Sequence, residues 1–398
     1  MERSTLLARG IEETIVSLSS SQLLTNRSSQ HEEGRSLRVG VIDFQNDERV
    51  IPFLSAHASS LIYHHPAWLT ALQEETGQQC FMLGCESDDG SLCGIMPLAY
   101  TRGLPFNIFN HQTKRRVSSL PRTPFVGPIS LIPEATDLLI AAALERAETE
   151  SIQLQIKSDR LLPQGDHDKL VCTEWRPTYV LALSESAKQL NLRDAKTRHK
   201  LKWGVNKARK LNLAVRAAET VAHLEAWYRL YLTTMRRNFV PPRSYKFFLS
   251  LWRGLNQSGS MRLLLAEQIT GSRTTLVAGS IFLMMGKTVS YAFTGCSTRH
   301  LSTHANDIIL WHAINGAGHD GYRFFDFGEV PEHRPELIRF KKKWGSLPKP
   351  LYRYYWPQPE QSAIPNKPHW LQSALKQTWQ RVPLSITARV GGWIYGYL

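Results

Sequence analysis

The sequence predicts an α/β protein of the α+β kind, with two modules that each combine a mixed, twisted sheet with flanking helices. Length is the first reason, because 398 residues are many for one hydrophobic core, so two cores are expected. Composition is the second, since 42% hydrophobic and 21% charged residues are ordinary for a globular protein. The third is a repeated order of elements: helix, hairpin, strand, helix and strand follow each other twice along the chain.

The first half of the chain opens with an apolar strand pattern and continues with helix and hairpin signals. Pro66 suits the first turn of a helix, and the polar residues 87–91 between two apolar runs are typical of a hairpin turn. The elements expected here are a strand at 37–43, a helix from residue 66, a hairpin of 80–85 and 92–100, a helix at 133–148 and a strand at 152–156.

The second half repeats this order with few identical residues. Leu224, Trp227, Tyr228 and Tyr231 follow the i, i+3, i+4, i+7 spacing of one helix face. The expected elements are helices at 224–235 and 245–255, strands at 263–267, 276–285 and 288–294, a helix at 303–318 and a strand at 322–327. An unrelated α/β protein with turns and loops at similar positions is the alternative, because element order alone is a weak signal.

Composition shifts along the chain suggest four segments. Residues 1–36 are polar and Ser-rich, which predicts a disordered leader without the apolar core of a signal peptide. The two modules are expected at 37–177 and 178–357. The tail at 358–398 is basic and aromatic, and its tryptophans and tyrosines suit either a membrane interface or packing on the second module. Pro383, Gly391 and Gly392 argue against one long helix in this tail.

The formal net charge of +14 favours a polyanionic partner, such as RNA, a nucleotide-linked substrate or an anionic membrane surface. A merely soluble basic protein is the alternative. The five cysteines are scattered and show no paired spacing of a zinc site, so no metal is expected. The longest apolar run, 276–285, is too short to span a bilayer. A cytoplasmic protein with reduced thiols is therefore expected, either soluble or peripherally attached to the inner face of the membrane.

A strongly basic segment at 193–216 is predicted to be one helix. It contains nine Lys or Arg residues and a single acid, Asp194, whereas solvated helices normally mix the two signs. Leu201, Val205 and Ala208 supply a narrow apolar face. Arg198, Lys202 and Lys210 are therefore candidates for binding a phosphate-bearing donor, with a solvated helix face as the alternative.

The loop between Gly295 and Ala305 precedes a helix, and helix N-termini are common sites for anions. Ser302 or Thr303 is the expected N-cap. His304 and Asn306 are candidates for contacts with the donor, although His304 equally fits a structural role. The loop has no glycine between Gly295 and Gly316, so the backbone cradle that usually holds the coenzyme A pyrophosphate is not expected.

The segment Asp326-Phe327-Gly328 ends a predicted strand and is followed by Phe340-Lys341 in a basic helix. Protein kinases also contain Asp-Phe-Gly, but their glycine-rich loop and catalytic-loop motifs are missing from this sequence. Asp326 is a candidate catalytic residue because side chains at strand ends often carry function. A role as a strand-end cap is equally compatible with its position.

These motifs resemble the FemAB family, whose members are built from tandem GNAT-type acyltransferase modules. Members end in a D-F-G…F-K-x-x-[FW]-G signature, which corresponds here to Asp326–Gly328 and Phe340–Gly345. The basic helix resembles their R-x-x-I-R-x-A-x-K-x-G segment, with Asn212 in place of the glycine. The resemblance covers roughly 37–356 and is strongest over 195–346. It implies tandem GNAT-like modules.

The resemblance also implies roles for particular residues. Lys341, rather than Lys342 or Lys343, would lie near the acyl donor and stabilise negative charge that develops on the reacting carbonyl oxygen. Phe340 would pack beside Lys341, and Tyr291 and Gly328 would contribute to substrate or donor binding.

The function implied is an acyl or aminoacyl transferase that forms an amide on an amine of a cell-envelope or exopolysaccharide-linked acceptor, such as a peptidoglycan precursor. The donor would be aminoacyl-tRNA or acyl-CoA, with no tightly bound cofactor. Two alternatives stay open at this point: a GNAT acyl-CoA N-acyltransferase, which the missing glycine loop disfavours, and a non-catalytic basic module that binds RNA or a membrane. A cleft lined by Lys341 and Asp326 would favour the enzymes over the binding module.

Overall fold

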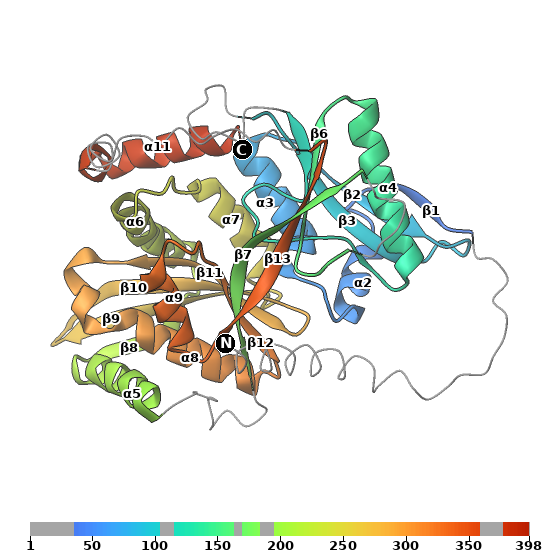
Figure 1. Ribbon diagram of the computed structural model, residues 1–398. Helices are drawn as coiled ribbons and strands as arrows, with labels where there is room; N and C mark the ends of the chain where they lie inside the picture. Colours follow the sequence, from blue (N-terminus) through green and yellow to red (C-terminus); the bar gives the residue numbers. More distant parts are fainter. Residues whose placement is uncertain (1–35, 104–114, 163–168, 184–194, 359–376, 398) are drawn as a thin grey trace, which may run out of the picture. The chain divides into compact units, whose positions relative to one another are not determined.

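One mixed sheet of 13 strands runs through the described part of the computed structural model (Figure 1). The described residues are 36–103, 115–162, 169–183, 195–358 and 377–397. The predicted leader therefore lies outside them, apart from Ser36. The strand order is β1-β2-β3-β4-β6-β13-β7-β12-β11-β10-β9-β8, with β5 paired to β3. The predicted α/β class with mixed strand directions and flanking helices is confirmed.

The first half of the chain forms the predicted helix, hairpin, helix and strand. Helix α3 begins at Pro66 and ends at Thr76, and Gly77 follows in the left-handed conformation. The hairpin of β2 and β3 pairs Leu83 with Met96. The elements of this half are β1 (Arg38–Ile42), α2 (Val50–Ala56), η1 (Ile62–His64), α3 (Pro66–Thr76), β2 (Cys80–Glu86), β3 (Leu92–Thr101), β4 (Arg116–Ser118), β5 (Ile129–Ser130), α4 (Pro133–Thr149) and β6 (Gln153–Ser158).

The second half also follows the predicted order. Helices α6 and α7 bury the apolar positions that the spacing indicated, including Trp227 and Phe248. The elements are β7 (Val171–Ala182), α5 (Ala195–Lys210), β8 (Leu213–Ala217), α6 (Val221–Arg237), α7 (Tyr245–Leu255), β9 (Met261–Thr270), β10 (Arg273–Met285), β11 (Thr288–Cys296), η2 (Thr298–Thr303), α8 (Ala305–His319), β12 (Phe324–Glu329), α9 (Pro335–Lys342), β13 (Leu347–Trp356) and α11 (Leu384–Tyr395).

The basic helix is shorter than predicted. The prediction of one helix over 193–216 is wrong at its C-terminal end, because α5 ends at Lys210 and the chain continues as the edge strand β8. Asn212 takes a positive φ of 56° between them, which is the left-handed turn that asparagine tolerates. Residues 213–217 then pair with β9.

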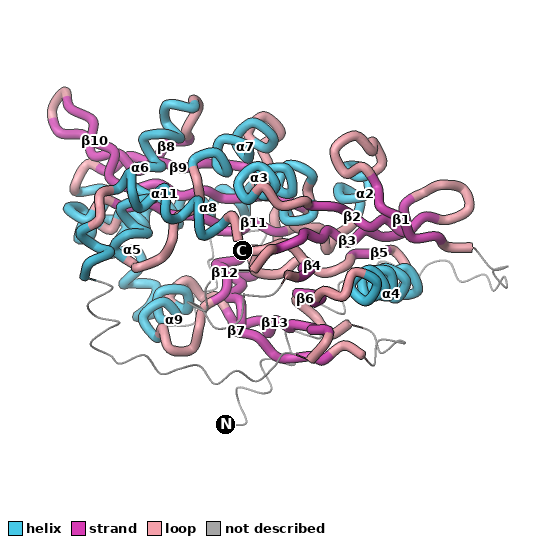
Figure 2. Tube along the Cα trace, turned by 90° about the horizontal axis from the view of Figure 1, so that it is seen from above, coloured by secondary structure: helices cyan, strands magenta, loops and turns pink. Residues whose placement is uncertain are grey.

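Strands β7 and β13 lie side by side at the centre of the sheet (Figure 2). β13 also pairs with β6, opposite residues 154–158, although it comes nearly 200 positions later in the chain. The expected module boundary between residues 177 and 178 falls within β7. The C-terminal strand therefore completes the sheet of the first module, a pairing that local periodicity has no means of showing.

The tail ends in the helix α11, which contains two of its three glycines. The described part of the tail forms no single long helix, as predicted, because a short helix ends before Pro383 and α11 begins after it, although α11 runs through Gly391 and Gly392. A Cβ atom at Gly391 would overlap Pro242, so glycine permits close packing at this point. Among the described residues, no helix combines the length and apolarity needed to cross a bilayer.

Candidate functional site

The parallel strands β11 and β12 pair over only three residues and then separate. Ser290 opposite Asp326 is the last pair in register, while β11 continues to Cys296 and β12 to Glu329. The first module repeats this arrangement, since β4 and β6 pair in parallel only over 116–118 and 153–155. Such a divergence leaves backbone groups and side chains at strand ends free for other contacts.

Asp326 lies at the point where β12 leaves β11, and it is 4% exposed. Its Oδ1 accepts a hydrogen bond from the Thr178 hydroxyl of β7 and one from the backbone N–H of Gly328 at 2.8 Å. Gly328 has a φ of 79°, so Asp326 caps the tight turn that glycine makes possible. Burial raises the pKa of Asp326 above its usual value, although these hydrogen bonds and Lys341 oppose the shift.

Lys341 is the buried member of the three consecutive lysines, and it extends from α9 to the turn at Gly328 near the end of β12. It is 8% exposed, whereas Lys342 is exposed and Lys343 is intermediate. Its Nζ donates to the carbonyl oxygen of Gly328 at 2.6 Å and to that of Glu329 at 3.3 Å. Burial lowers the pKa of Lys341 to about 8, and the charges of Asp326 and Glu329 oppose this shift.

The arrangement holds an ammonium group in place without neutralising it. An ammonium has three N–H donors, and the two carbonyls take two of them. The neighbouring Asp326 carboxylate accepts from Thr178 and Gly328 instead of from Lys341. A fixed cation with a remaining donor is suited to stabilising negative charge on a reacting oxygen. The roles of Lys341 and Asp326 in catalysis stay predictions.

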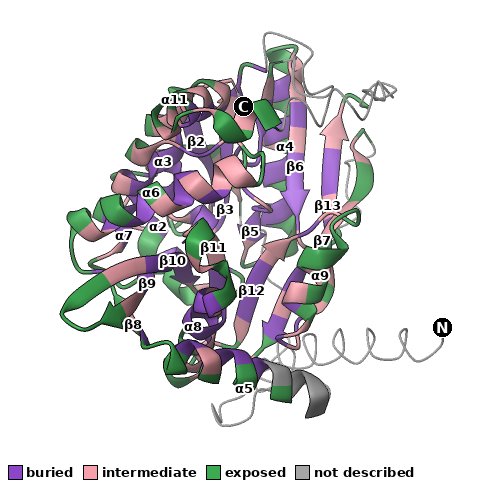
Figure 3. Cartoon of the chain, turned by 90° about the vertical axis from the view of Figure 1, so that its left-hand side faces the viewer, coloured by how far each residue is buried: buried purple, intermediate pink, exposed green. Residues whose placement is uncertain are grey.

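The polar face of the sheet continues from Asp326 into the first module. Glu329 accepts a hydrogen bond from Trp175 Nε1 at 2.9 Å, and its carboxylate lies 3.8 Å from Arg353. Arg353 donates to the Pro124 carbonyl at 3.3 Å and covers the Trp175 ring. Lys157 donates to the carbonyls of Leu120 and Thr123. β6 and β12, which carry part of this face, are largely buried (Figure 3).

Sequence reasoning did not single out Glu329, Arg353, Lys157 or Thr178. One signal was available for Lys157, because a lysine among the alternating residues of β6 takes an inward position. Arg353 gave no such signal, since Tyr352, Tyr354 and Tyr355 around it do not show which face is buried. Their proximity depends on β13 pairing with β6 and β7.

Two other predicted site residues lie away from Asp326. The Tyr291 ring stacks on Phe282 at 5.6 Å and meets Phe327 edge-on, so it packs in the core. Its neighbour in sequence, Ser290, is the residue that lies opposite Asp326. Phe340 is partly buried in the same apolar cluster, and Lys343 Nζ lies 4.8 Å from the centre of its ring. The structure does not bring either ring against the Lys341 ammonium through a described contact.

The N-terminus of α8 differs from the prediction. The expected caps Ser302 and Thr303 are wrong, because they belong to the short helix η2 and His304 is the N-cap, with a φ of 60°. Asp307 in the first turn accepts from Lys343 at 2.5 Å and approaches His304 Nδ1 at 3.0 Å. A carboxylate of the chain itself therefore occupies the position that suits an anion. Asn306 is half-buried, and its Oδ1 has no partner among the described residues.

Helix α5 packs against this end of α8. Its apolar face is as predicted, with Leu201, Val205 and Ala208 buried. A Cβ atom at Gly204 would lie 3.0 Å from Asp307, which shows how closely the two helices approach. Lys202 and Lys210 are exposed, and Arg198 belongs to α5 with its side chain outside the described residues. The exposed lysines thus form a basic surface beside α8.

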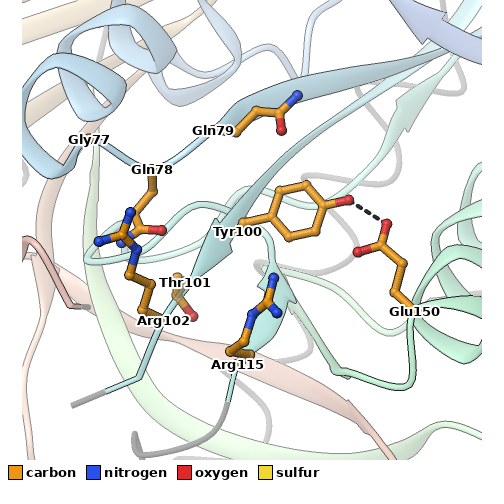
Figure 4. A pocket seen from close by; sticks show the side chains of 8 residues that line it. All are labelled: Gly77, Gln78, Gln79, Tyr100, Thr101, Arg102, Arg115 and Glu150. Atoms are coloured by element: carbon orange, nitrogen blue, oxygen red, sulfur yellow. Dashed lines mark hydrogen bonds between the residues drawn. The ribbon is translucent and has the colours of Figure 1, made fainter. Parts of the chain in front are cut away.

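A cavity of about 770 Å³ opens at the ends of β3 and α3 in the first module. Figure 4 shows Tyr100 pointing toward Glu150 across it, and their hydrogen bond measures 2.5 Å. Two arginines, Arg102 and Arg115, add positive charge to its wall. In the described part of the chain, no group of three or more His, Cys, Asp and Glu side chains is placed to hold a metal ion.

Comparison with known proteins identifies a domain family for part of the chain and solved structures with a similar fold for most of it. Residues 195–342 match the model of the acetyltransferase (GNAT) domain family. The fold is similar to the crystal structure of FemX, at 14% identity and a TM-score of 0.60, over 80% of this chain and 97% of that chain. It is also similar to L-PGS from Bacillus licheniformis, at 13% identity and a TM-score of 0.54, over 85% and 98%.

A third similar structure is the C-terminal domain (DUF2156) of a putative lysylphosphatidylglycerol synthetase from Agrobacterium fabrum. Its identity is 12% and its TM-score 0.52, over 83% of this chain and 94% of that chain. No curated protein matches the sequence. The match over residues 195–342 confirms the GNAT part of the resemblance and indicates an acyltransferase domain, and the FemX structure shares the fold of the chain.

Proposed function

We propose that this chain, a FemAB-like protein with a GNAT acyltransferase domain, transfers an acyl or aminoacyl group to an amine of a cell-envelope or polysaccharide-linked acceptor. The observation that carries the proposal is the Lys341 ammonium, which two backbone carbonyls hold beside the buried Asp326 where β12 leaves β11. The titles of two similar structures also name L-PGS and a putative lysylphosphatidylglycerol synthetase.

The reaction is a direct attack of the acceptor amine on the donor carbonyl. A new C–N bond forms and the carbonyl oxygen gains negative charge, which the Lys341 ammonium stabilises. The bond from carbon to the leaving oxygen or sulfur then breaks and the carbonyl re-forms. The amine loses one proton and the leaving group gains one, so the exchange balances without a protein nucleophile.

The surroundings of α8 favour aminoacyl-tRNA over acyl-CoA as the donor. The N-terminus of α8, where a GNAT fold would receive the coenzyme A pyrophosphate, holds Asp307 in an ion pair with Lys343. The exposed lysines of α5 provide a surface for a larger polyanion beside it. Transfer from acyl-CoA is the second candidate, and the match to an acetyltransferase (GNAT) model supports it.

A donor screen with the purified full chain tests the function. The chain is incubated with an amine acceptor mixture and either charged tRNA or a series of acyl-CoA thioesters, and amide products are measured by mass spectrometry. Products from charged tRNA alone support the leading proposal, and products from acyl-CoA alone support the second candidate. A chain that forms no amide with any donor, while retaining its cooperative unfolding transition, contradicts acyl transfer.

We infer further that the chain works in the cytoplasm, attached peripherally to the inner face of the membrane through α11. Ile386 and Trp393 lie seven residues apart on one side of this helix, and each is 47% exposed. Arg389 is also exposed, and it follows Ile386 at helical spacing. An apolar and basic helix surface is suited to the headgroup region of an anionic leaflet, where a lipid-linked acceptor would be found.

A further inference from the structure

A group of buried polar side chains in the first module combines excess positive charge with hydrogen-bonding atoms that have no partner. We call Arg116, Lys157, Arg353, Thr101 and Ser118 the cation cluster. Strand register places them on one face of the sheet. Thr101 of β3 lies opposite Arg116 of β4, and Lys157 of β6 lies opposite Arg353 of β13. Ser118 is two residues beyond Arg116, so its side chain points to the same side.

Three polar atoms in the cation cluster are buried without a hydrogen-bond partner among the described residues. They are the hydroxyl oxygens of Thr101 and Ser118 and the Nε of Arg116. Thr101 is only 2% exposed and Ser118 only 1%. Buried polar groups in folded proteins are nearly always paired, because an unpaired group costs its full desolvation energy. Three such atoms on one face therefore point to a ligand with several acceptor oxygens.

The charges of the cation cluster are also incompletely balanced. Burial lowers the pKa of Lys157, and the positive charges of Arg353 and Arg116 lower it further. Burial lowers the pKa of Arg116 to about 10. Glu329 faces the cluster, at 3.8 Å from Arg353, and it is one carboxylate against three cations. Buried cations destabilise a fold unless anions compensate them, so an anionic ligand would relieve this imbalance.

We propose that the cation cluster is a binding site for a phosphate or diphosphate group. A guanidinium fork, an ammonium and two hydroxyl donors together match the tetrahedral oxygens of a phosphate. Thr101 is also one of the residues that line the 770 Å³ cavity at the end of β3 (Figure 4), so the cluster and the cavity share this residue, and the cavity offers space for the rest of a ligand. The cluster shares its face of the sheet with Asp326 and Glu329. The inference that a phosphate-bearing second substrate binds to the cation cluster rests on the proposed acyl transfer, whereas the inference that the cluster binds phosphate does not.

Thermal unfolding with inorganic pyrophosphate tests the site without any turnover. Pyrophosphate should raise the unfolding midpoint of the full chain, because a ligand that binds only the folded state stabilises it. Arg116→Gln should raise or preserve the midpoint without ligand, since it removes a cation that burial disfavours, and it should abolish the increase with pyrophosphate. Arg253→Gln is the matched control, because it removes an exposed arginine of α7 that belongs neither to the cation cluster nor to the cavity wall, and it should respond like the unmodified chain.

Ser118→Ala provides a second variant that does not depend on charge. Removing an unpartnered buried hydroxyl should leave unfolding unchanged, while pyrophosphate binding measured by calorimetry should weaken about tenfold if that hydroxyl donates to a phosphate oxygen. Binding of uridine diphosphate and of farnesyl diphosphate is measured in the same way. The tighter of the two shows whether the diphosphate belongs to a soluble nucleotide or to a lipid. A variant of α5, Lys202→Gln with Lys210→Gln, should bind pyrophosphate normally.

The proposal is overturned if pyrophosphate neither stabilises nor binds the full chain. It is equally overturned if Arg253→Gln weakens binding as much as Arg116→Gln, or if only the α5 variant loses binding. Failure of the donor screen together with intact pyrophosphate binding would remove the proposed function and retain this site.

Discussion

At the scale of single residues, burial distinguishes side chains that are alike in the sequence. Lys341, Lys342 and Lys343 are identical in type and adjacent in sequence, yet Lys341 alone among them is buried. Lys343 instead pairs with Asp307. The burial that costs Lys341 hydration also strengthens its interaction with any negative charge that develops nearby.

Replacement of Lys341 by alanine should lower turnover about 10²–10³-fold, by analogy with removal of one oxyanion donor. Lys342→Ala is the control, because this exposed neighbour should lose little turnover. The measurement is the single-turnover rate with saturating donor. Equal losses from both variants would mean that the lysine run acts only as a diffuse positive surface.

The pH dependence of the same reaction gives an independent readout. Lys341 must be protonated to stabilise an oxyanion, and its pKa is lowered to about 8, so this contribution is complete below about pH 8 and is lost as the pH rises through it. Lys341→Arg keeps its charge at all these pH values and should extend any remaining activity to higher pH. A falling limb that is unchanged in Lys341→Arg would contradict the assignment.

At the scale of elements, α5 combines a packing face with an exposed basic face. Leu201, Val205 and Ala208 are buried against the second module, which leaves Lys202 and Lys210 in solvent. The helix ends at Lys210 because the chain must return as β8 to cover the edge of β9. The basic surface is therefore rigidly attached next to α8.

Binding of tRNA through α5 should weaken steeply with added salt, because phosphate contacts release counterions. Lys202→Gln combined with Lys210→Gln should reduce the slope of log affinity against log salt by about 1.5 units, at roughly 0.7 to 0.9 per contact. Electrophoretic mobility shifts between low and moderate salt measure this slope. Lys246→Gln, which removes an exposed lysine of α7, is the control, and an unchanged slope in the α5 variant would exclude α5 as the contact surface.

At the scale of the whole chain, segments that are distant in sequence pack against each other. Arg243, just before α7, forms a buried ion pair with Glu75 of α3 and donates to the Arg122 carbonyl at 3.0 Å. The tail closes over this region, since Tyr395 of α11 is buried and lies under the guanidinium groups of Arg122 and Arg243. Gln78 donates to the Gly396 carbonyl at 2.7 Å. These contacts show that one side of α11 packs on the rest of the chain, whereas Ile386 and Trp393 stay exposed.

Two kinds of tail variant separate packing from membrane attachment. Truncation at Pro365 should lower the unfolding midpoint, because it removes α11 from α3 and α6 (Figure 1). Ile386→Ser combined with Trp393→Ala changes only the exposed side of α11, and it should reduce co-sedimentation with anionic vesicles while leaving the midpoint within about 1 °C, as surface changes usually do. Unchanged co-sedimentation of the double variant would contradict attachment through α11.

The sequence by itself determined the elements and their order. Pro66 marks the start of α3, the polar residues 87–91 between two apolar runs give the hairpin of β2 and β3, and the i, i+3, i+4 spacing gives α6 and α7, because these signals depend on residues that are close in sequence. The sequence also singled out Asp326 by its position at the end of a predicted strand and Lys341 through a resemblance. The structure places them around one turn at Gly328.

The tertiary structure alone decided which strands complete which module and which charges are buried together. β13 pairs with β6 on one side and with β7 on the other, and these pairings bring Arg353 to Lys157 and, across β7, to Glu329. The end of α5 and the cap of α8 were likewise decided by packing, since β8 must cover β9 and Asp307 must meet Lys343. Local patterns record propensity and periodicity, whereas the partner of a strand or a buried charge depends on residues that are distant along the chain.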